Sequence, residues 1–160
     1  MTGWTTAGLY DAHAAELRLC SLPLRDFGGR IAFRGAVRTL RCLGDNTPVR
    51  AALAGPGGGA VLVVDGAGLL DCALVGDRLA AEAARLGWSG IVVNGAVRDL
   101  ARLRGIPLGL KALGPCPRPS AKGALGERDV PVELGGAAIT PGDWLYADAD
   151  GIVIAARRLD

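Results

Sequence analysis

The sequence predicts an α/β protein in which a βαβ core is joined to an antiparallel β layer. The run Ala60-Val61-Leu62-Val63-Val64 is continuously apolar and bounded by glycine, as expected for a strand covered on both faces. Residues 77–86 have apolar side chains at helical spacing and lead, after Gly87, to a second apolar run at 90–93. Two buried strands joined by a helix imply a right-handed crossover between parallel strands.

Short apolar runs separated by turn residues fill the later part of the chain. They predict strands at 108–113, 130–134, 137–140, 144–147 and 152–155. Three prolines mark 115–122 as a loop, and the charged residues 126–129 indicate a turn from which Glu127 could reach a neighbouring subunit. The late half of the chain is therefore expected to be mostly β.

Four further elements are expected in the first part of the chain and after the second buried strand. A helix capped by Thr5 or Thr6 should run to Leu17, and the alternation from Ile31 to Thr39 predicts a half-buried strand. Thr47 as N-cap and Pro48 at the first helical position predict a short helix that the glycine run 55–59 ends. A last short helix should follow residues 98–99 and end near 105–107.

Length and composition limit the class of protein. With 160 residues, the chain is expected to form one domain, residues 1–160, with a core that needs no disulfide or metal staple. The chain is 50% hydrophobic but only 4% aromatic, and it has 25 glycines, so small and aliphatic side chains must fill the core. A net charge of +2 without a block of like charge argues against direct nucleic-acid binding.

The remaining composition points to a reduced, cytoplasmic protein. The four cysteines are widely spaced among apolar neighbours, which predicts buried thiols and no zinc site (Cys20, Cys42, Cys72 and Cys116). The N-terminus lacks the pattern of a signal peptide, and no apolar run approaches the roughly 20 residues that span a bilayer. We therefore expect no membrane association.

Three motifs are better explained by turns or packing than by a site. Residues 63–68 follow a buried strand but lack a complete G-x-G-x-x-G, so a strand-ending turn is expected, although Asp65 could line a cleft. The aspartates of 143–150 do not have EF-hand spacing. His13, the single histidine, lies on the apolar first helix and is expected to be a partly exposed packing residue.

The strongest candidate site is Gly76-Asp77-Arg78-Leu79 together with Arg98-Asp99. Twenty residues separate Asp77 from Arg98, within one strand-helix unit, so two helix entrances could face one small site. A helix start offers free N–H groups to an anion, and an arginine can bind a carboxylate or a developing enolate. An aspartate can hold a hard divalent cation. These parts suit a metal-dependent site for a small oxoacid.

Each half of this site also has an ordinary structural explanation. Gly76-Asp77 could be only a helix start, since aspartate is a favoured capping residue. Asp99 could be a charge at a helix N-terminus, and Arg98 could be a solvated surface residue. The joint placement of the two pairs favours the functional interpretation.

The sequence resembles the RraA-like family, which contains the regulator of ribonuclease E activity and the 4-hydroxy-4-methyl-2-oxoglutarate aldolases. The resemblance covers nearly the whole chain. The matching segments are Phe27-Gly28-Gly29-Arg30, residues 63–66, Gly76-Asp77, residues 95–99 and residues 142–148. It implies a swivelling β/β/α domain and a ring-shaped homotrimer with active sites between subunits.

The aldolase branch implies a function and roles for the site residues. Asp99 matches the ligand of a divalent metal, magnesium or manganese, and Arg98 matches the arginine that binds the oxoacid. Residues 76–79 match the loop that cradles pyruvate through its backbone, and Asp77 matches an acid that positions metal-bound water. The implied reactions are aldol cleavage of 4-hydroxy-4-methyl-2-oxoglutarate and decarboxylation of oxaloacetate through a pyruvate enolate.

The regulator branch implies a different function. The compact length is similar to that of the regulators, which bind and inhibit ribonuclease E, and the glutamate of the longer aldolases has no match here. That branch does not require an Arg-Asp pair, whereas this sequence has one at 98–99. The aldolase is therefore the first expectation and the ribonuclease regulator the alternative.

Overall fold

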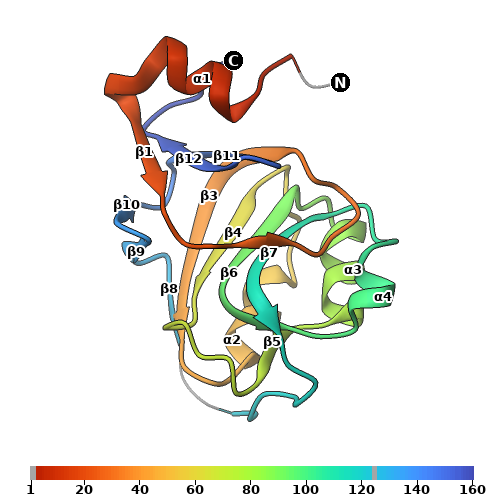
Figure 1. Cartoon of the computed structure of the whole chain (residues 1–160). Helices are drawn as coiled ribbons and strands as arrows, with labels where there is room; N and C mark the ends of the chain where they lie inside the picture. Colours follow the sequence, from red (N-terminus) through yellow and green to blue (C-terminus); the bar gives the residue numbers. More distant parts are fainter. Residues whose placement is uncertain (1–2, 124–125) are drawn as a thin grey trace.

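A mixed β-sheet forms the centre of the computed structural model, which describes residues 3–123 and 126–160 (Figure 1). Ten strands of the described chain belong to this sheet: β1 Leu17–Cys20, β2 Arg25–Asp26, β3 Phe33–Cys42, β4 Val61–Asp65, β5 Ala73–Val75, β6 Gly90–Val97, β7 Gly109–Pro115, β8 Gly126–Arg128, β11 Trp144–Asp148 and β12 Gly151–Ala155. Two more strands, β9 Val132–Leu134 and β10 Ala137–Ile139, form a separate hairpin. The predicted mixed α/β class is confirmed.

The middle of the sheet is parallel, as the two apolar runs predict. Strands β3, β4, β6 and β7 are successive parallel neighbours, and β5 pairs in parallel with β6. The path from β4 through β5 and the helix α3 (Asp77–Arg85) to β6 is the expected crossover. Antiparallel strands β11, β12 and β1 extend the sheet beyond β3.

Helices cover one face of the parallel strands. The helices α2 (Thr47–Leu53), α3 and α4 (Leu100–Leu103) bury their apolar residues against alternate side chains of β3, β4 and β6. Leu53, Ala83 and Leu103 are each 1% exposed or less. Burial of this apolar surface is the main force holding the helices in place.

The opposite face of the same strands packs against other β-strands. Phe33, Val63 and Val92 share a core with the β9–β10 hairpin and with the inner faces of β11 and β12. A Cβ atom on Gly90 or Gly109 would lie 2.2–2.3 Å from the Phe33 ring, so both positions require glycine for this ring to cross β6 and β7. The parallel strands are thus enclosed by a helical layer and a β layer.

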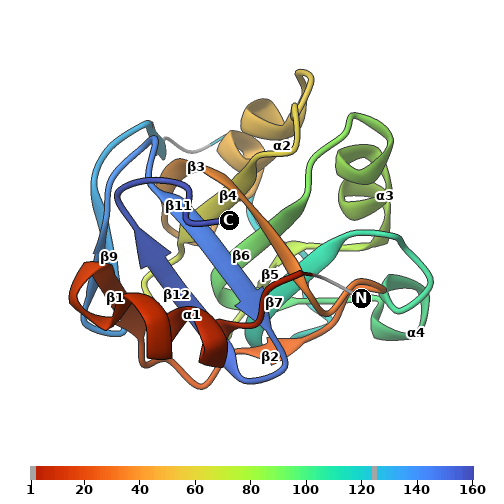
Figure 2. The ribbon, with the colours of Figure 1, turned by 90° about the horizontal axis from the view of Figure 1, so that it is seen from above.

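The N-terminal helix is shorter than predicted. Helix α1 (Thr6–His13) passes into a 3₁₀ turn, Ala14–Glu16, and Leu17 begins β1 instead of ending the helix. Leu17 has helical spacing, but it lies in a strand because pairing of β1 with β12 gives the backbone N–H and C=O groups of this segment their hydrogen-bond partners. Only Thr6 and Leu9 of α1 are buried, and Tyr10 is 42% exposed. Figure 2 shows α1 lying over β11 and β12.

Four other predictions need correction. Residues 126–128 form β8, paired with β3, instead of lying in a charged turn. Asn46 occupies the N-cap of α2, so Thr47 and Pro48 lie one position further into the helix than expected. Cys116 is only partly buried, whereas the other three thiols are buried; burial raises the pKa of Cys42 to about 11. Ile31, predicted as the first residue of a half-buried strand, is 48% exposed and precedes β3, which begins at Phe33.

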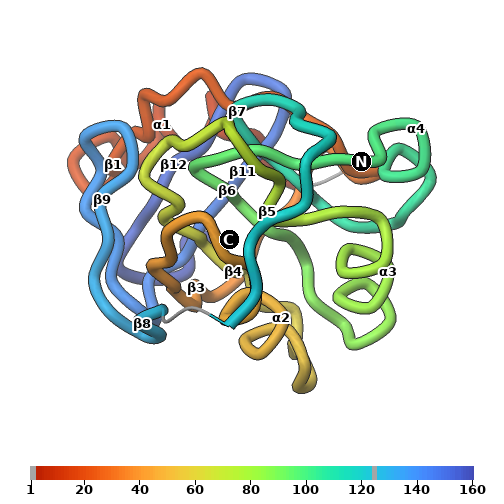
Figure 3. The backbone as a smooth tube through the Cα atoms, turned by 90° about the horizontal axis from the view of Figure 1, so that it is seen from below, coloured from red at the N-terminus to blue at the C-terminus, as the bar shows by residue number. Residues whose placement is uncertain are grey.

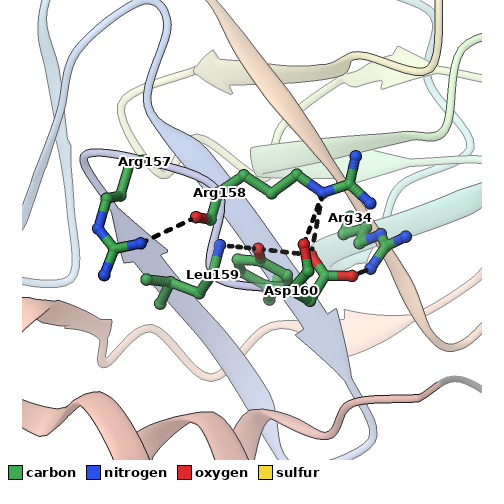
Figure 4. A network of polar contacts seen from close by, with 6 residues as sticks. Arg34, Arg157, Arg158, Leu159 and Asp160 are labelled. Carbon is green, nitrogen blue, oxygen red and sulfur yellow. Dashed lines mark hydrogen bonds and ion pairs between the residues drawn. The ribbon is translucent and has the colours of Figure 1, made fainter.

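The last residues are tied to the sheet by polar contacts (Figure 4). The Tyr146 hydroxyl donates to Asp160 Oδ1 at 2.8 Å and accepts the N–H of Leu159 at 2.8 Å. The Asp160 carboxylate also pairs with Arg34 and Arg158. These contacts hold residues 158–160 against β3 and β11. None of the helices in the described part of the chain is both long and apolar enough to cross a bilayer.

Asp148 fastens α1 to the end of β11. Its carboxylate accepts the Thr6 N–H at 2.7 Å and the Thr6 hydroxyl at 2.6 Å, and it also accepts the Asp150 N–H at 3.0 Å. Burial alone would raise the pKa of Asp148, but the hydrogen bonds from Thr6 and Asp150 outweigh it and lower the pKa. The charged form is therefore the one that the fold stabilises.

We predict that Asp148→Ala lowers the free energy of unfolding by about 2 kcal/mol, since hydrogen bonds to a charged group are lost. Because the folded pKa lies below the unfolded one, this contribution is complete above about pH 4 and disappears as pH falls through the folded value. Urea unfolding of Asp148→Ala and of the exposed neighbour Asp150→Ala, at pH 7 and pH 3, measures both effects. Equal stability of the two variants at pH 7 would contradict the role of Asp148.

Candidate functional site

Two strand-helix corners meet at one edge of the sheet. Strand β5 leads through Gly76 into α3, and β6 leads through Arg98 and Asp99 into α4. Because β5 and β6 are adjacent and parallel, their carboxyl ends lie together, where ligands bind in open α/β sheets. The Arg98 N–H donates to the Val75 carbonyl at 3.0 Å and extends this pairing to the corner itself.

Direct contacts join the two corners. The Asp77 N–H, at the start of α3, donates to Asp99 Oδ2 at 3.2 Å. A Cβ atom on Gly76 would lie 2.8 Å from the same oxygen and 3.4 Å from Arg98 Cγ. Glycine is therefore required at 76 for the Asp99 carboxylate and the Arg98 side chain to approach the helix start.

The backbone of Asp99 adopts a left-handed conformation. Its φ of 66° and ψ of 42° are uncommon for a residue with a side chain, although aspartate tolerates them better than most. The Asp99 carbonyl accepts N–H groups from Arg102 and Leu103 and so begins the short helix α4. Such strained residues cluster at functional sites, because the surrounding structure must hold them in place.

The corners form one wall of a cavity of about 490 Å³. Among the described residues, it is lined by Asn46, Arg50, Ala73, Gly76, Asp77, Arg78, Leu79, Arg98, Asp99, Arg102, Pro119, Ser120 and Lys122. Every predicted site residue, from Gly76 to Leu79 and at 98–99, lies on this lining. Five lining side chains are basic and two are acidic, so the cavity suits an anionic ligand.

The rest of the lining contains residues that the sequence analysis did not select. Lys122 Nζ donates to Asn46 Oδ1 at 2.6 Å and to Ser120 Oγ at 3.0 Å, and the Asn46 N–H donates to Ser120 Oγ at 2.9 Å. In Figure 3 the segment after β7 runs past β5 toward α2, which explains how residues 46 and 122 meet. No local pattern in the sequence signals this contact between two distant loops.

Arg102 was also missed, although it lies one turn into α4 on the side of the site. Its Nη1 is 3.0 Å from Asp77 Oδ2, while Asp77 Oδ1 accepts the Arg78 N–H at 2.8 Å. The hydrogen bond from the Arg102 guanidinium is the main reason that the pKa of Asp77 lies below its usual value. Asp77 is therefore ionised and oriented at neutral pH. Arg102 lies three residues after Asp99, about one helical turn, and this spacing could have indicated it as a site residue from the sequence alone.

The two carboxylates fit a hard divalent cation only in part. Within the described residues, no group of three or more His, Cys, Asp and Glu side chains could hold a metal ion. Asp99 and Asp77 supply carboxylate oxygens within one hydrogen-bonded unit. Magnesium commonly binds one or two protein carboxylates and takes its remaining ligands from water and substrate. The donor set suits that mode of binding.

Other candidate residues lie away from the cavity. Asp65 accepts the Ala67 N–H at 3.0 Å and lies 3.7 Å from Arg41, so it ends β4 in a turn and does not line this cleft. His13 Nδ1 is 3.8 Å from Glu16 and belongs to the surface of α1. Asp143 and Asp148 accept hydrogen bonds within turns and from α1, as turn chemistry predicts.

Fold and site together define a small α/β protein with a cationic pocket at the carboxyl ends of parallel strands. The family profile RraA-like, described as Aldolase/RraA, matches residues 6–154. The chain belongs to the RraA-like family, and the resemblance found in the sequence is confirmed.

Relatives in the family have different names. A protein of Alkalilimnicola ehrlichii named "Putative 4-hydroxy-4-methyl-2-oxoglutarate aldolase" is 53% identical over 154 residues, which are 96% of each chain. The structure of the RNA-processing inhibitor RraA from Thermus thermophilis has a TM-score of 0.95 and 43% identity, covering 99% of this chain and 96% of that one.

A third relative is named for another activity. The structure of S-adenosylmethionine: 2-dimethylmenaquinone methyltransferase from Geobacillus kaustophilus has a TM-score of 0.94 and 44% identity, covering 98% of this chain and 97% of that one. Three similar proteins thus have three different names. Function must therefore be argued from the site.

We predict that Gly76→Ala weakens binding of oxalate, a planar dianion resembling a pyruvate enolate, at least tenfold in the presence of Mg²⁺. The added methyl group would push Asp99 Oδ2 and the Arg98 side chain away from the start of α3. Titration calorimetry measures the affinity. Gly55→Ala is the matched control, because a Cβ there meets nothing within 4 Å. Equal affinity of the two variants would contradict the joint role of the corners.

Proposed function

We propose that this protein is a divalent-metal-dependent aldolase that cleaves 4-hydroxy-4-methyl-2-oxoglutarate-like oxoacids to pyruvate and also decarboxylates oxaloacetate. The observation that carries the proposal is the junction of the two corners: a guanidinium, two carboxylates and a helix start meet at one end of the cavity. The 53% identical relative named as such an aldolase supports the same reaction class.

Substrate binding follows from the charges of the cavity. Arg98 is assigned to the carboxylate and keto oxygen of the oxoacid, since a guanidinium can donate two parallel hydrogen bonds. The backbone of residues 76–79 at the start of α3 is assigned to the pyruvoyl end. There the N–H groups of Asp77 and Arg78 would exchange their present acceptors, the carboxylates of Asp99 and Asp77, for the substrate. Asp99 is assigned as the protein ligand of Mg²⁺ or Mn²⁺.

The chemistry requires negative charge to develop on the keto oxygen. When the C3–C4 bond breaks, its electron pair forms the pyruvate enolate, and the other product leaves as a ketone or as carbon dioxide. Arg98 is placed to stabilise that oxygen, and fixed charges of this kind contribute most of the rate enhancement in many enzymes. A bound divalent cation supplies further Lewis-acid stabilisation of the same charge.

Asp77 is assigned to proton transfer. A water oriented by its carboxylate accepts the proton of the C4 hydroxyl during aldol cleavage, and a proton is later returned to C3 of the enolate. Decarboxylation of oxaloacetate needs only the second transfer. Arg102 keeps Asp77 ionised, which suits a carboxylate that orients water.

We predict that Arg98→Ala and Asp99→Asn each lower kcat for pyruvate release at least a hundredfold, because each removes stabilisation of the enolate. Asparagine at 99 tolerates the left-handed backbone, so the corner should keep its shape. Pyruvate is measured from oxaloacetate and from 4-hydroxy-4-methyl-2-oxoglutarate, with Mg²⁺ or Mn²⁺ and with excess chelator.

Arg104→Ala is the matched control, an exposed arginine one turn beyond the site that does not line the cavity. All variants should keep the wild-type melting temperature and the wild-type mass in light scattering. We propose that this mass is that of a homotrimer; the exposed side chains of Leu43, Leu69 and Leu70 offer apolar surface for such contacts. Full activity in both Arg98→Ala and Asp99→Asn would contradict the aldolase assignment.

A second candidate function is binding and inhibition of ribonuclease E. The supporting observation is the fold shared with the RNA-processing inhibitor from Thermus thermophilis, with a TM-score of 0.95. A cavity at the edge of the sheet leaves outer surface available to a protein partner, so one chain could serve both functions.

We predict that any such complex survives both Arg98→Ala and excess chelator, since a surface contact needs neither the metal nor the oxoacid pocket. Surface plasmon resonance with purified ribonuclease E measures the affinity of wild type and variant. Failure of the wild-type protein to bind the ribonuclease, with or without metal, would exclude this second function.

A further inference from the structure

A second hollow adjoins the cationic cavity between α2 and α3. It has a volume of about 320 Å³ and is lined by Arg50, Leu53, Ala54, Arg78, Leu79 and Glu82. We call it the side hollow. Arg50, Arg78 and Leu79 line both spaces, so a ligand that fills the cavity can extend into the side hollow without leaving protein contact.

The side hollow is less polar than the cavity. Leu53 and Leu79, 1% and 6% exposed, form its inner wall, and the exposed Ala54 also lines it. The carboxylate of Glu82 is engaged by Arg85, with hydrogen bonds of 2.9 and 2.6 Å to its two oxygens. The single acid of the hollow is therefore paired, and apart from Arg50 and Arg78 the rest of the wall is aliphatic.

Two arginines stand where the two spaces join. Within the residues that the structure describes, the guanidinium groups of Arg50 and Arg78 make no hydrogen bond or ion pair. Both side chains are exposed and can therefore turn toward an anion. A ligand that suits this arrangement has its anionic end in the cationic cavity and its apolar end in the side hollow.

We propose that the side hollow receives an apolar branch larger than a methyl group at C4 of the substrate. This inference rests on the proposed aldolase function and extends it to 4-hydroxy-2-oxoacids that carry an alkyl or aryl branch. An apolar cavity of about 150 Å³ holds a benzene ring, so a hollow of about 320 Å³ has room for a phenyl group. Each methylene that leaves water should raise affinity about fourfold.

The cleavage of such a substrate is balanced without another reactant. In 4-hydroxy-2-oxo-4-phenylbutanoate the C4 hydroxyl loses its proton, the C3–C4 bond breaks and benzaldehyde leaves. The electron pair of that bond forms the pyruvate enolate, which takes up a proton at C3. The phenyl ring stays in the side hollow until benzaldehyde is released, while Arg98 and Asp77 act at the other end of the substrate.

The test fills the side hollow by substitution. Ala54→Leu adds an aliphatic side chain to its wall at a residue with ordinary right-handed backbone geometry, which leucine adopts freely. Ala51→Leu is the matched control: it makes the same change on α2 at an exposed position that lines neither space. Thermal unfolding confirms that both variants are folded.

The expected result is a fall of at least tenfold in the ratio of kcat/KM for 4-hydroxy-2-oxo-4-phenylbutanoate to kcat/KM for oxaloacetate in Ala54→Leu, with the wild-type ratio kept in Ala51→Leu. An unchanged ratio in Ala54→Leu would overturn the inference. So would a wild-type protein that decarboxylates oxaloacetate but does not cleave the phenyl compound.

Calorimetric binding of 4-phenyl-2-oxobutanoate, which lacks the C4 hydroxyl and is not cleaved, separates this inference from the proposed function. Binding that Ala54→Leu weakens at least tenfold, and that Ala51→Leu leaves intact, supports the side hollow even if no variant turns over any substrate. Binding that neither substitution affects, or no binding to the wild-type protein, overturns it.

Discussion

The parallel pairing of β5 with β6 is the constraint on which the site depends. It brings the residue after β5 and the residues after β6 to the same edge, so the N–H at the start of α3 reaches the Asp99 carboxylate. Helix α3 sets this pairing, because it must return over the sheet between the two strands. An enclosed sheet, with helices on one face and β-strands on the other, gives the two corners a rigid support.

The site concentrates like charge and backbone strain in a way that a purely structural corner would not need. Five basic side chains and two carboxylates line the cavity, and the guanidinium groups of Arg50 and Arg78 have no hydrogen-bond or ion-pair partner among the described residues. Asp99 keeps a left-handed backbone that costs stability. Concentrated like charge and a strained backbone both cost stability, and features of this kind cluster at functional sites.

Local pattern was a good guide where one face of an element dominated its environment. The apolar runs at 60–64 and 90–93 and the helix at 77–86 correspond to observed elements, as does the alternation predicted from Ile31 to Thr39, except that its strand begins at Phe33. The pattern was wrong where pairing with a distant strand decided the outcome. Leu17 was predicted to end the first helix but lies in β1, paired with β12. The charged residues 126–128 were predicted to form a turn but form the short strand β8 beside β3. Backbone hydrogen bonding to a remote partner leaves little trace in nearby residues.

The sequence alone determined the family, the mixed α/β class and the cluster formed by Gly76–Leu79 with Arg98 and Asp99, because these depend on short-range spacing and on motifs close together in the chain. Only the tertiary structure decided that Asn46, Arg102, Ser120 and Lys122 join that cluster, and that a side hollow opens between α2 and α3. The physical reason is that the walls of a cavity come from segments up to 76 residues apart, as in the Lys122–Asn46 contact. Their meeting is set by how the layers pack and not by any local preference of the chain.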